Sequence, residues 1–188
     1  VNSIQVGGRN LVTGTEQDIV IDDTPNTQDK GWRFVIIYLT QQPKLGDQIT
    51  VSAEATLTGR GDLSSYSAVL FNSTTTNERS ALANLIPGKR SNATLTINNL
   101  DGTGDTVLLL YAGKQSDTQG KKNIIHHLKV EFGNQATDWT PAPEDIDKKI
   151  DTQTLDSANI DEMKTQGHYF VRNLSGNPVG GWVYVDVT

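Results

Sequence analysis

The most regular pattern along the chain is an alternation of apolar and polar residues over residues 48–57. Every second residue from Ile49 to Leu57 is apolar, and the positions between them carry threonine, serine or glutamate. A period of two is typical of a β-strand with one buried face. The segment is therefore predicted to be an antiparallel strand that turns one face to a core and the other to solvent.

Other strand-sized runs precede and follow this segment, with turn signals between them. Strands are predicted over residues 18–21, 32–39, 66–71, 94–98, 106–111 and 123–132. Turn residues separate them, as in Gln42–Asp47, Ile86–Lys89 and Asp101–Gly104. Many short strands without long helices favour a mostly β fold, an antiparallel jelly-roll-like β-sandwich over residues 9–143. In the strand over 123–132, Ile124, His126 and Leu128 are expected to face the core and His127 the solvent.

The segments outside the sandwich have other patterns. Residues 1–8 form a short polar linker, and the prolines Pro141 and Pro143 close the sandwich. Residues 144–158 are charged, with Ile146 and Ile150 one helical step apart, which predicts a helical linker or neck. So narrow an apolar stripe is marginal in isolation, so this helix is expected to pack on copies of itself or on the next domain. Residues 159–188 contain two further strand patterns, at 168–171 and 182–187, and begin another small domain.

Composition excludes several classes of partner and cofactor. The chain has 188 residues, 16 Lys and Arg against 22 Asp and Glu, and a net charge of −6 at pH 7. Without a basic stripe, nucleic-acid binding is not expected. No apolar run reaches transmembrane length, no signal peptide is visible, and a membrane partner is not expected. Cysteine is absent, so neither disulfides nor a thiolate metal site can form.

The sequence offers little for catalysis, for a metal or for a cofactor. There is no Gly-x-Ser-x-Gly motif, and the adjacent His126 and His127 would face opposite sides of a strand. Asp22–Asp23 and Asp101–Asp105 have calcium-type oxygens, but turn chemistry is the favoured interpretation. Glu54 and Glu131 keep open a pair of carboxylates for glycoside hydrolysis. We expect a non-enzyme without a metal or cofactor.

Saccharide binding is the chemistry that the residues suit best. Sugars present apolar C–H faces to aromatic rings, and hydroxyl rims to polar or charged side chains. Trp32, beside Arg33 at the start of a strand, and Tyr111, at the end of one, are the candidate platforms. Trp139, in the closing segment, is expected to plug the sandwich edge. The candidate ligand-binding residues are Trp32, Arg33, Tyr66, Arg79, Tyr111, Lys114 and Gln115.

Two segments resemble a known family frame. Gly7–Val12 at the start and Leu128–Asp145 at the end are similar to segments that enclose carbohydrate-binding modules in tail and receptor-binding proteins of phages infecting lactic acid bacteria and streptococci. Gly46–Ser52 looks like the turn and strand of the same modules. Residues 160–187 resemble the pyocin-knob type of tail-fibre domain. These framing motifs bear on the fold, and none of them supplies ligand contacts.

The resemblance implies a function on the virion. A phage tail module would attach to cell-wall polysaccharide or teichoic-acid glycan of a Gram-positive host, outside the cell, alongside other tail proteins. The knob-like segment implies a homotrimer with residues 144–158 as its neck. Two alternatives stay open: a structural spacer of the tail fibre without a ligand, and a glycan depolymerase or esterase.

Overall fold

The computed structural model describes residues 7–75, 77–149, 168–169 and 183–184. Eight strands lie within residues 1–143, the first of two compact units into which the chain divides. They are β1 (Ile19–Asp22), β2 (Phe34–Tyr38), β3 (Gln48–Gly59), β4 (Tyr66–Asn72), β5 (Ala83–Leu85), β6 (Ser91–Thr96), β7 (Thr106–Tyr111) and β8 (Lys121–Phe132). Seven of these match predicted segments to within a few residues, and the three-residue β5 was not predicted.

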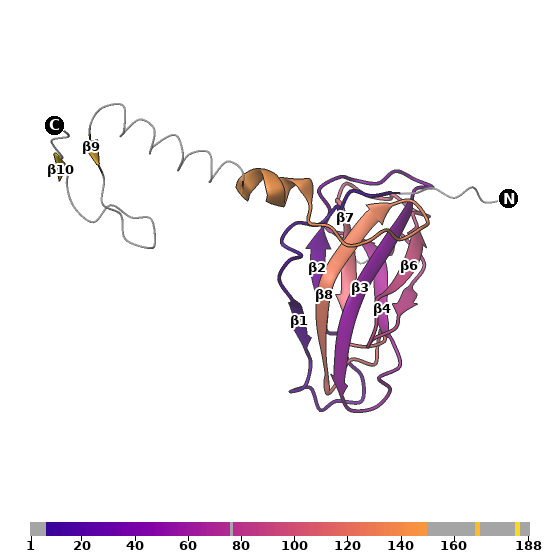
Figure 1. The fold of residues 1–188 in the computed structure, drawn as a ribbon. Helices are drawn as coiled ribbons and strands as arrows, with labels where there is room; N and C mark the ends of the chain where they lie inside the picture. The colour runs from indigo at the N-terminus through magenta and orange to yellow at the C-terminus, as the bar shows by residue number, and fades with distance from the viewer. Residues whose placement is uncertain (1–6, 76, 150–167, 170–182, 185–188) are drawn as a thin grey trace. The chain divides into compact units, whose positions relative to one another are not determined.

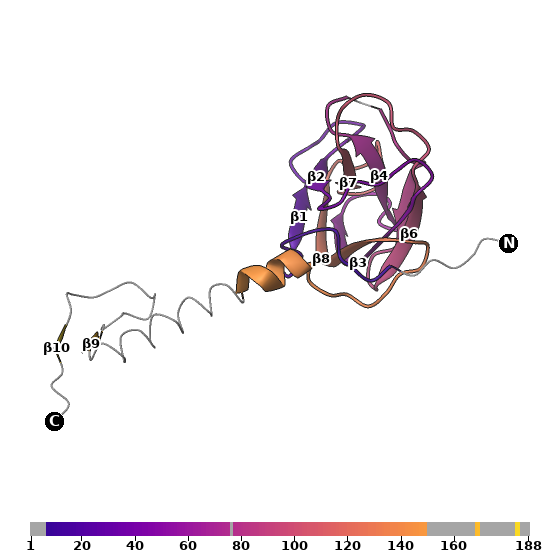
Figure 2. The ribbon, with the colours of Figure 1, turned by 90° about the horizontal axis from the view of Figure 1, so that it is seen from above.

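The eight strands form two antiparallel four-stranded sheets, with orders β1-β8-β3-β6 and β2-β7-β4-β5. The two layers are visible in Figure 1 and, from above, in Figure 2. Every connection between consecutive strands of the sandwich crosses to the opposite sheet, except the one from β4 to β5, and the first and last of these strands, β1 and β8, pair side by side. This is the strand order of a jelly roll. The predicted fold class, a jelly-roll-like β-sandwich, is therefore confirmed.

The core lies between the two sheets and follows the predicted alternation. Ile49, Val51, Ala53 and Ala55 of β3 are all buried in one hydrophobic cluster. The cluster continues through inward residues of the facing sheet, such as Leu70, Leu108 and Leu110. Burying aliphatic side chains against each other in this way stabilises the fold by about 1.5–3 kcal/mol for each side chain.

A β-bulge in β8 changes which residues face the core. Ser52 pairs with Lys129 and Glu54 with His126, so two steps along β3 correspond to three along β8. His127 has φ +48° within this bulge. The extra residue inverts the alternation, so Ile125 rather than His126 enters the core. The expectation that His126 is a core residue was wrong: it is partly exposed, with Nδ1 2.6 Å from an Asp18 carboxylate oxygen.

The framing segments meet around Asn10, which is completely buried. Its amide group donates to the carbonyl oxygens of Leu128 and Thr140, each at 3.1 Å. Its carbonyl oxygen accepts from the backbone N–H groups of Val12 and Val130. One side chain thus ties the start of the sandwich to β8 and to the closing segment, which gives the Gly7–Val12 motif a structural role.

Trp139 belongs to the same closure. Its indole N–H donates to the Thr15 hydroxyl at 3.2 Å, and its ring lies 4.6 Å from the His127 imidazole, centroid to centroid. Gly7 approaches the backbone of Phe132 so closely that a Cβ at residue 7 would overlap that carbonyl oxygen. The contacts of Trp139 with Thr15 and His127 help to close the sandwich, as the sequence predicted.

The second unit comprises residues 144–188. A helix covers residues 143–149, where the predicted neck begins, and the remainder of that neck, 150–158, lies outside the described residues. Two short strands, β9 (His168–Tyr169) and β10 (Val183–Tyr184), pair antiparallel within the segments predicted as strands. The other residues of the predicted knob-like region lie outside the described ranges. Among the residues described, no helix is long and apolar enough to span a membrane.

Candidate functional site

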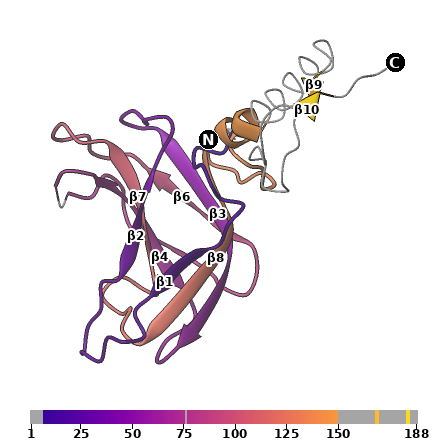
Figure 3. The same cartoon turned by 90° about the vertical axis from the view of Figure 1, so that its left-hand side faces the viewer.

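An apolar groove of about 290 Å³ lies on the outer face of the sheet β2-β7-β4-β5. The strands supply its floor, because their outward side chains are apolar as well as their inward ones. The segments before β2 and after β4 and β7 supply its rim. Its lining consists of Trp32, Phe34, Ile36, Phe71, Asn72, Ser73, Thr75, Val107, Leu109, Tyr111 and Gln115. Figure 3 views the sandwich from the edge at which β1 and β2 lie.

Three aromatic side chains shape the groove. Trp32 precedes β2 and is 54% exposed, whereas Tyr111 at the end of β7 is 2% exposed. Phe34 lies between these extremes and packs against Tyr111, with ring centroids 5.5 Å apart and planes tilted by 57°. The groove therefore has a fixed aromatic floor and a tryptophan at its mouth whose ring remains available to a ligand.

Polar groups gather at one end of the groove. The Gln115 side-chain amide donates to the Tyr111 hydroxyl at 3.2 Å and to a Glu78 carboxylate oxygen at 3.4 Å. Its backbone N–H donates to the Ser67 hydroxyl at 2.9 Å, which fixes the loop after β7. Burial raises the pKa of the Tyr111 hydroxyl, so it stays protonated at neutral pH and keeps a donor as well as an acceptor.

Of the seven residues predicted to bind ligand, the structure brings together Trp32, Tyr111 and Gln115. Arg33 is exposed but lies outside the groove lining. Lys114 is also outside it, and its ammonium instead pairs with the Asp62 carboxylate at 2.6 Å. That ion pair and the Ser64 N–H hold the pKa of Asp62 well below its usual range.

Tyr66 and Arg79 were wrongly predicted as ligand contacts, because both are buried. Tyr66 is 0% exposed, at the start of a strand that lies inside its sheet. Arg79 is 3% exposed, and its guanidinium donates to the Thr106 hydroxyl at 2.6 Å and to the carbonyl oxygens of Gly104 and Asp101. Arg79 therefore holds the loop before β7 in place and cannot reach a ligand.

Of the acidic residues considered for catalysis or calcium, Glu131 and Asp22 have structural partners, and Glu54 lies far from Glu131. Glu131 is completely buried, and both of its oxygens accept hydrogen bonds of 2.8 Å from Thr137. Glu131 pairs with Thr50, four residues from the exposed Glu54, so the two backbones are about 13 Å apart along β3. Asp22 accepts from the N–H and hydroxyl of Thr24, which is turn chemistry. Within the described ranges, no group of three or more metal-ligating side chains gathers.

Sequence reasoning missed the apolar lining residues, chiefly Phe34, Ile36, Phe71, Val107 and Leu109. A signal for them was present. The run Phe34–Leu39 is apolar at odd and even positions alike, whereas a sandwich strand with a solvated face alternates. Residues 106–111 share this feature. Adjacent strands with two apolar faces indicate an outer surface that has a binding role.

Comparison with known proteins adds one structural likeness. No protein-family model and no curated protein matches the sequence. A solved structure of the tripod from the baseplate of bacteriophage Tuc2009 resembles this chain with a TM-score of 0.45 at 14% sequence identity. The match covers 75% of this chain and 60% of that one, so this chain spans less than two thirds of its length.

Proposed function

We propose that this chain is a receptor-binding module of a phage tail, which attaches the virion to saccharides on a Gram-positive host surface and has no catalytic activity. The observation that carries the proposal is the apolar groove with Trp32 exposed at its mouth above the buried floor of Tyr111. A pyranose ring can stack its C–H face on the indole, and its hydroxyls can reach Gln115 at the polar end.

The framing motifs support the same class of module. Gly7–Val12 and Leu128–Asp145 resemble the segments that enclose such modules, and here Asn10 and Trp139 of these segments hold the sandwich closed. The ligand is then cell-wall polysaccharide or teichoic-acid glycan, and the other partners are tail proteins of the same virion. If residues 144–158 form the neck of a homotrimer, three weak sites act together, which raises avidity by orders of magnitude.

A structural spacer is the second candidate, because one observation favours it. Besides Trp32, the outer face of β2 exposes Ile36 and Tyr38, at 51% and 63%. An exposed apolar strip of this kind also suits packing against another tail protein. The two candidates differ in what Trp32 does: in a spacer it contributes packing area, and in a receptor-binding module it contributes the sugar platform.

The test is the binding of a fluorescent fusion of this chain to a panel of lactic acid bacteria and streptococci. We expect strain-selective labelling that Trp32→Ala abolishes. Tyr38→Ala is the matched control, since it removes a more exposed aromatic from the same face without touching the groove lining. Absence of labelling by a trimerised fusion would favour the spacer. Labelling that both variants lose equally would place the binding surface on the outer face of β2 rather than in the groove. Release of reducing ends from host polysaccharide would instead indicate a depolymerase.

A further inference from the structure

A second cavity lies beside the groove and differs from it in chemistry. Its volume is about 270 Å³, and its lining is almost wholly polar: Thr27, Gln28, Asp29, Arg60, Gly61, Asp117, Gln119 and Lys121. Three loops form it, one before β2, one after β3 and one between β7 and β8. None of the residues predicted as ligand contacts lines it, and neither the groove nor the framing motifs account for it.

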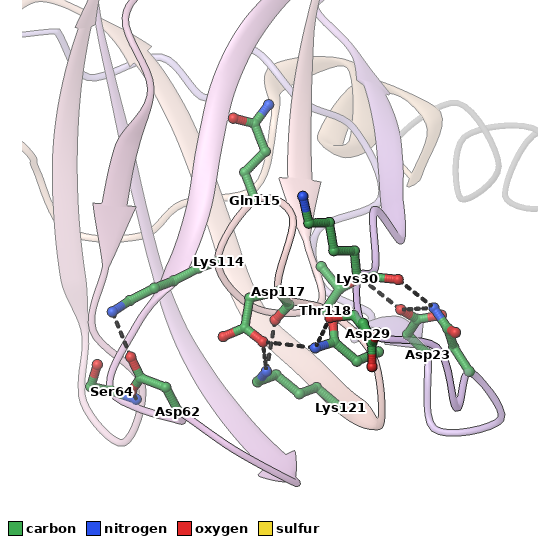
Figure 4. Close-up of polar contacts among 12 residues, drawn as sticks. Asp23, Asp29, Lys30, Asp62, Ser64, Lys114, Gln115, Asp117, Thr118 and Lys121 are labelled. Atoms are coloured by element: carbon green, nitrogen blue, oxygen red, sulfur yellow. Dashed lines mark hydrogen bonds and ion pairs between the residues drawn. The ribbon is translucent and has the colours of Figure 1, made fainter.

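An ion pair between a buried lysine, Lys121, and a partly exposed aspartate, Asp117, builds the floor of this polar cavity. Lys121 is 1% exposed, and its ammonium donates to the backbone oxygen of Asp117 at 2.7 Å and to its Oδ1 at 2.8 Å. The Gln119 amide also donates to Oδ1, at 3.2 Å. Both contacts use the same carboxylate oxygen, so Oδ2 of Asp117 has no hydrogen-bond partner among the described residues. Figure 4 shows this network, with Asp117 held above Lys121.

The loop between β7 and β8 separates the two cavities and borders both. Gln115 lines the apolar groove and Asp117 lines the polar cavity, only two residues further on. Figure 4 shows their side chains leaving this loop in different directions. Between them, Ser116 has φ +67°, one of two non-glycine residues with positive φ among those described. A non-glycine residue in the left-handed region is strained and persists only where surrounding contacts hold it, which is frequent at ligand-binding sites.

The charges around the polar cavity balance. Arg60 and Lys121 bring two positive charges, and Asp29 and Asp117 bring two negative ones. A phosphate or a uronate would gain no net attraction there. A row of sugar hydroxyls fits better, because each hydroxyl both donates and accepts, and the cavity offers guanidinium and amide donors next to carboxylate acceptors.

We infer that the polar cavity is a second saccharide subsite, which binds an uncharged, hydroxyl-rich stretch of the same polymer whose apolar face rests on Trp32. This inference rests on the proposed function. It implies that the ligand is a neutral glycan of several residues that crosses the loop at Ser116. A single terminal sugar, or a polymer bound through its phosphates, does not use both cavities.

The test uses wall polysaccharide purified from the most strongly labelled strain and partially hydrolysed into size fractions. Affinities of the full chain are measured by calorimetry for wild type, Arg60→Ala and Asp29→Ala. Both side chains are exposed, so neither change should affect folding, and thermal melts verify this. Lys114→Ala is the matched control, a cation at the same end of the sandwich that lines neither cavity.

We expect the two cavity variants to bind long fragments with a Kd about tenfold weaker, and the shortest bound fragments unchanged. Trp32→Ala should weaken both. Cavity variants that match wild type for every fragment overturn the inference, and so does an equal loss at every length. Affinity that falls steeply with added NaCl identifies an anionic ligand and also overturns it. If wild type binds no fragment at all, the proposed function itself has failed.

Discussion

The Gln115 side-chain amide donates a hydrogen bond of 3.2 Å to the Tyr111 hydroxyl. Tyr111 is the floor of the apolar groove and Gln115 is part of its rim, so this bond ties the loop after β7 to the sheet beneath it. The Gln115 amide also contacts Glu78 at 3.4 Å. A rim held at several points keeps its polar atoms in place before a ligand arrives, which lowers the entropic cost of binding.

Replacing Gln115 by alanine should therefore weaken glycan binding while leaving the fold intact. The hydrogen bonds lost are at the surface end of the groove, so we expect the free energy of unfolding to fall by no more than about 0.5–1 kcal/mol. Binding should weaken about three- to tenfold, because the rim loses the amide oxygen as an acceptor for sugar hydroxyls and the bonds that hold the rim in place. Titration of labelled cells with fluorescent fusions measures this. Unchanged affinity in Gln115→Ala would remove the rim from the site.

A second prediction concerns Asn10, whose buried amide bridges the two framing segments. Asn10→Ala removes the Asn10 partner of three buried groups, the N–H groups of Val12 and Val130 and the carbonyl oxygen of Leu128. Each unsatisfied buried group costs about 1–3 kcal/mol, so the free energy of unfolding should fall by about 3–4 kcal/mol. Urea denaturation measures it. Asn92→Ala, an exposed asparagine on β6, is the control and should change stability by less than about 0.5 kcal/mol.

Local sequence patterns predicted most of the fold, but they did not predict that Tyr66 is buried. Alternation, turn residues and the framing motifs were enough to predict seven strands, the sandwich and the closing role of Trp139, because these depend on local pattern. Burial of Tyr66 and Arg79 depends on which strands pair: β4 lies inside its sheet only because β5 and β7 flank it. No local sequence pattern specifies the order of strands within a sheet, and a three-residue strand such as β5 is too short to be predicted from its sequence.

The bulge in β8 is a second limit of the same kind. The extra residue makes the alternation opposite on the two sides of the bulge, so a prediction that is right for Leu128 is wrong for His126, which precedes the bulge residue His127. The lining of the groove, by contrast, could have been predicted from the sequence in part. The exposed Trp32 was predicted as a platform from its place at the start of a strand. The run Phe34–Leu39, apolar on both faces, was predicted only as a strand, although its second apolar face indicated the groove.

The bulge residue His127 permits a matched pair of substitutions. Its φ of +48° lies in the left-handed region, where asparagine is tolerated and β-branched residues are strained. Both His127→Asn and His127→Val remove the ring contact with Trp139, so their difference isolates the backbone. We expect Val to be about 1–2 kcal/mol less stable than Asn in urea denaturation. Equal stability of the two would mean that the backbone at residue 127 is not held in this conformation.

Alkaline pH should destabilise the sandwich through Tyr66. Burial raises the pKa of its hydroxyl above the usual value of 10, so the folded state holds this proton more tightly than the unfolded chain does. The stabilisation is fully present below pH 10 and is lost as the pH rises further, because the unfolded chain releases the proton first. Each such group contributes a loss of about 1.4 kcal/mol for each pH unit.

Tyr66→Phe should remove this contribution and flatten the fall in stability above pH 10, measured by urea denaturation at a series of pH values. Some slope will remain, since burial also raises the pKa of Tyr111. Tyr38→Phe is the control, because it removes the hydroxyl of a tyrosine that is 63% exposed. An identical alkaline slope in Tyr66→Phe and wild type would mean that water reaches this hydroxyl in the folded protein. That result would reopen Tyr66 as a ligand contact.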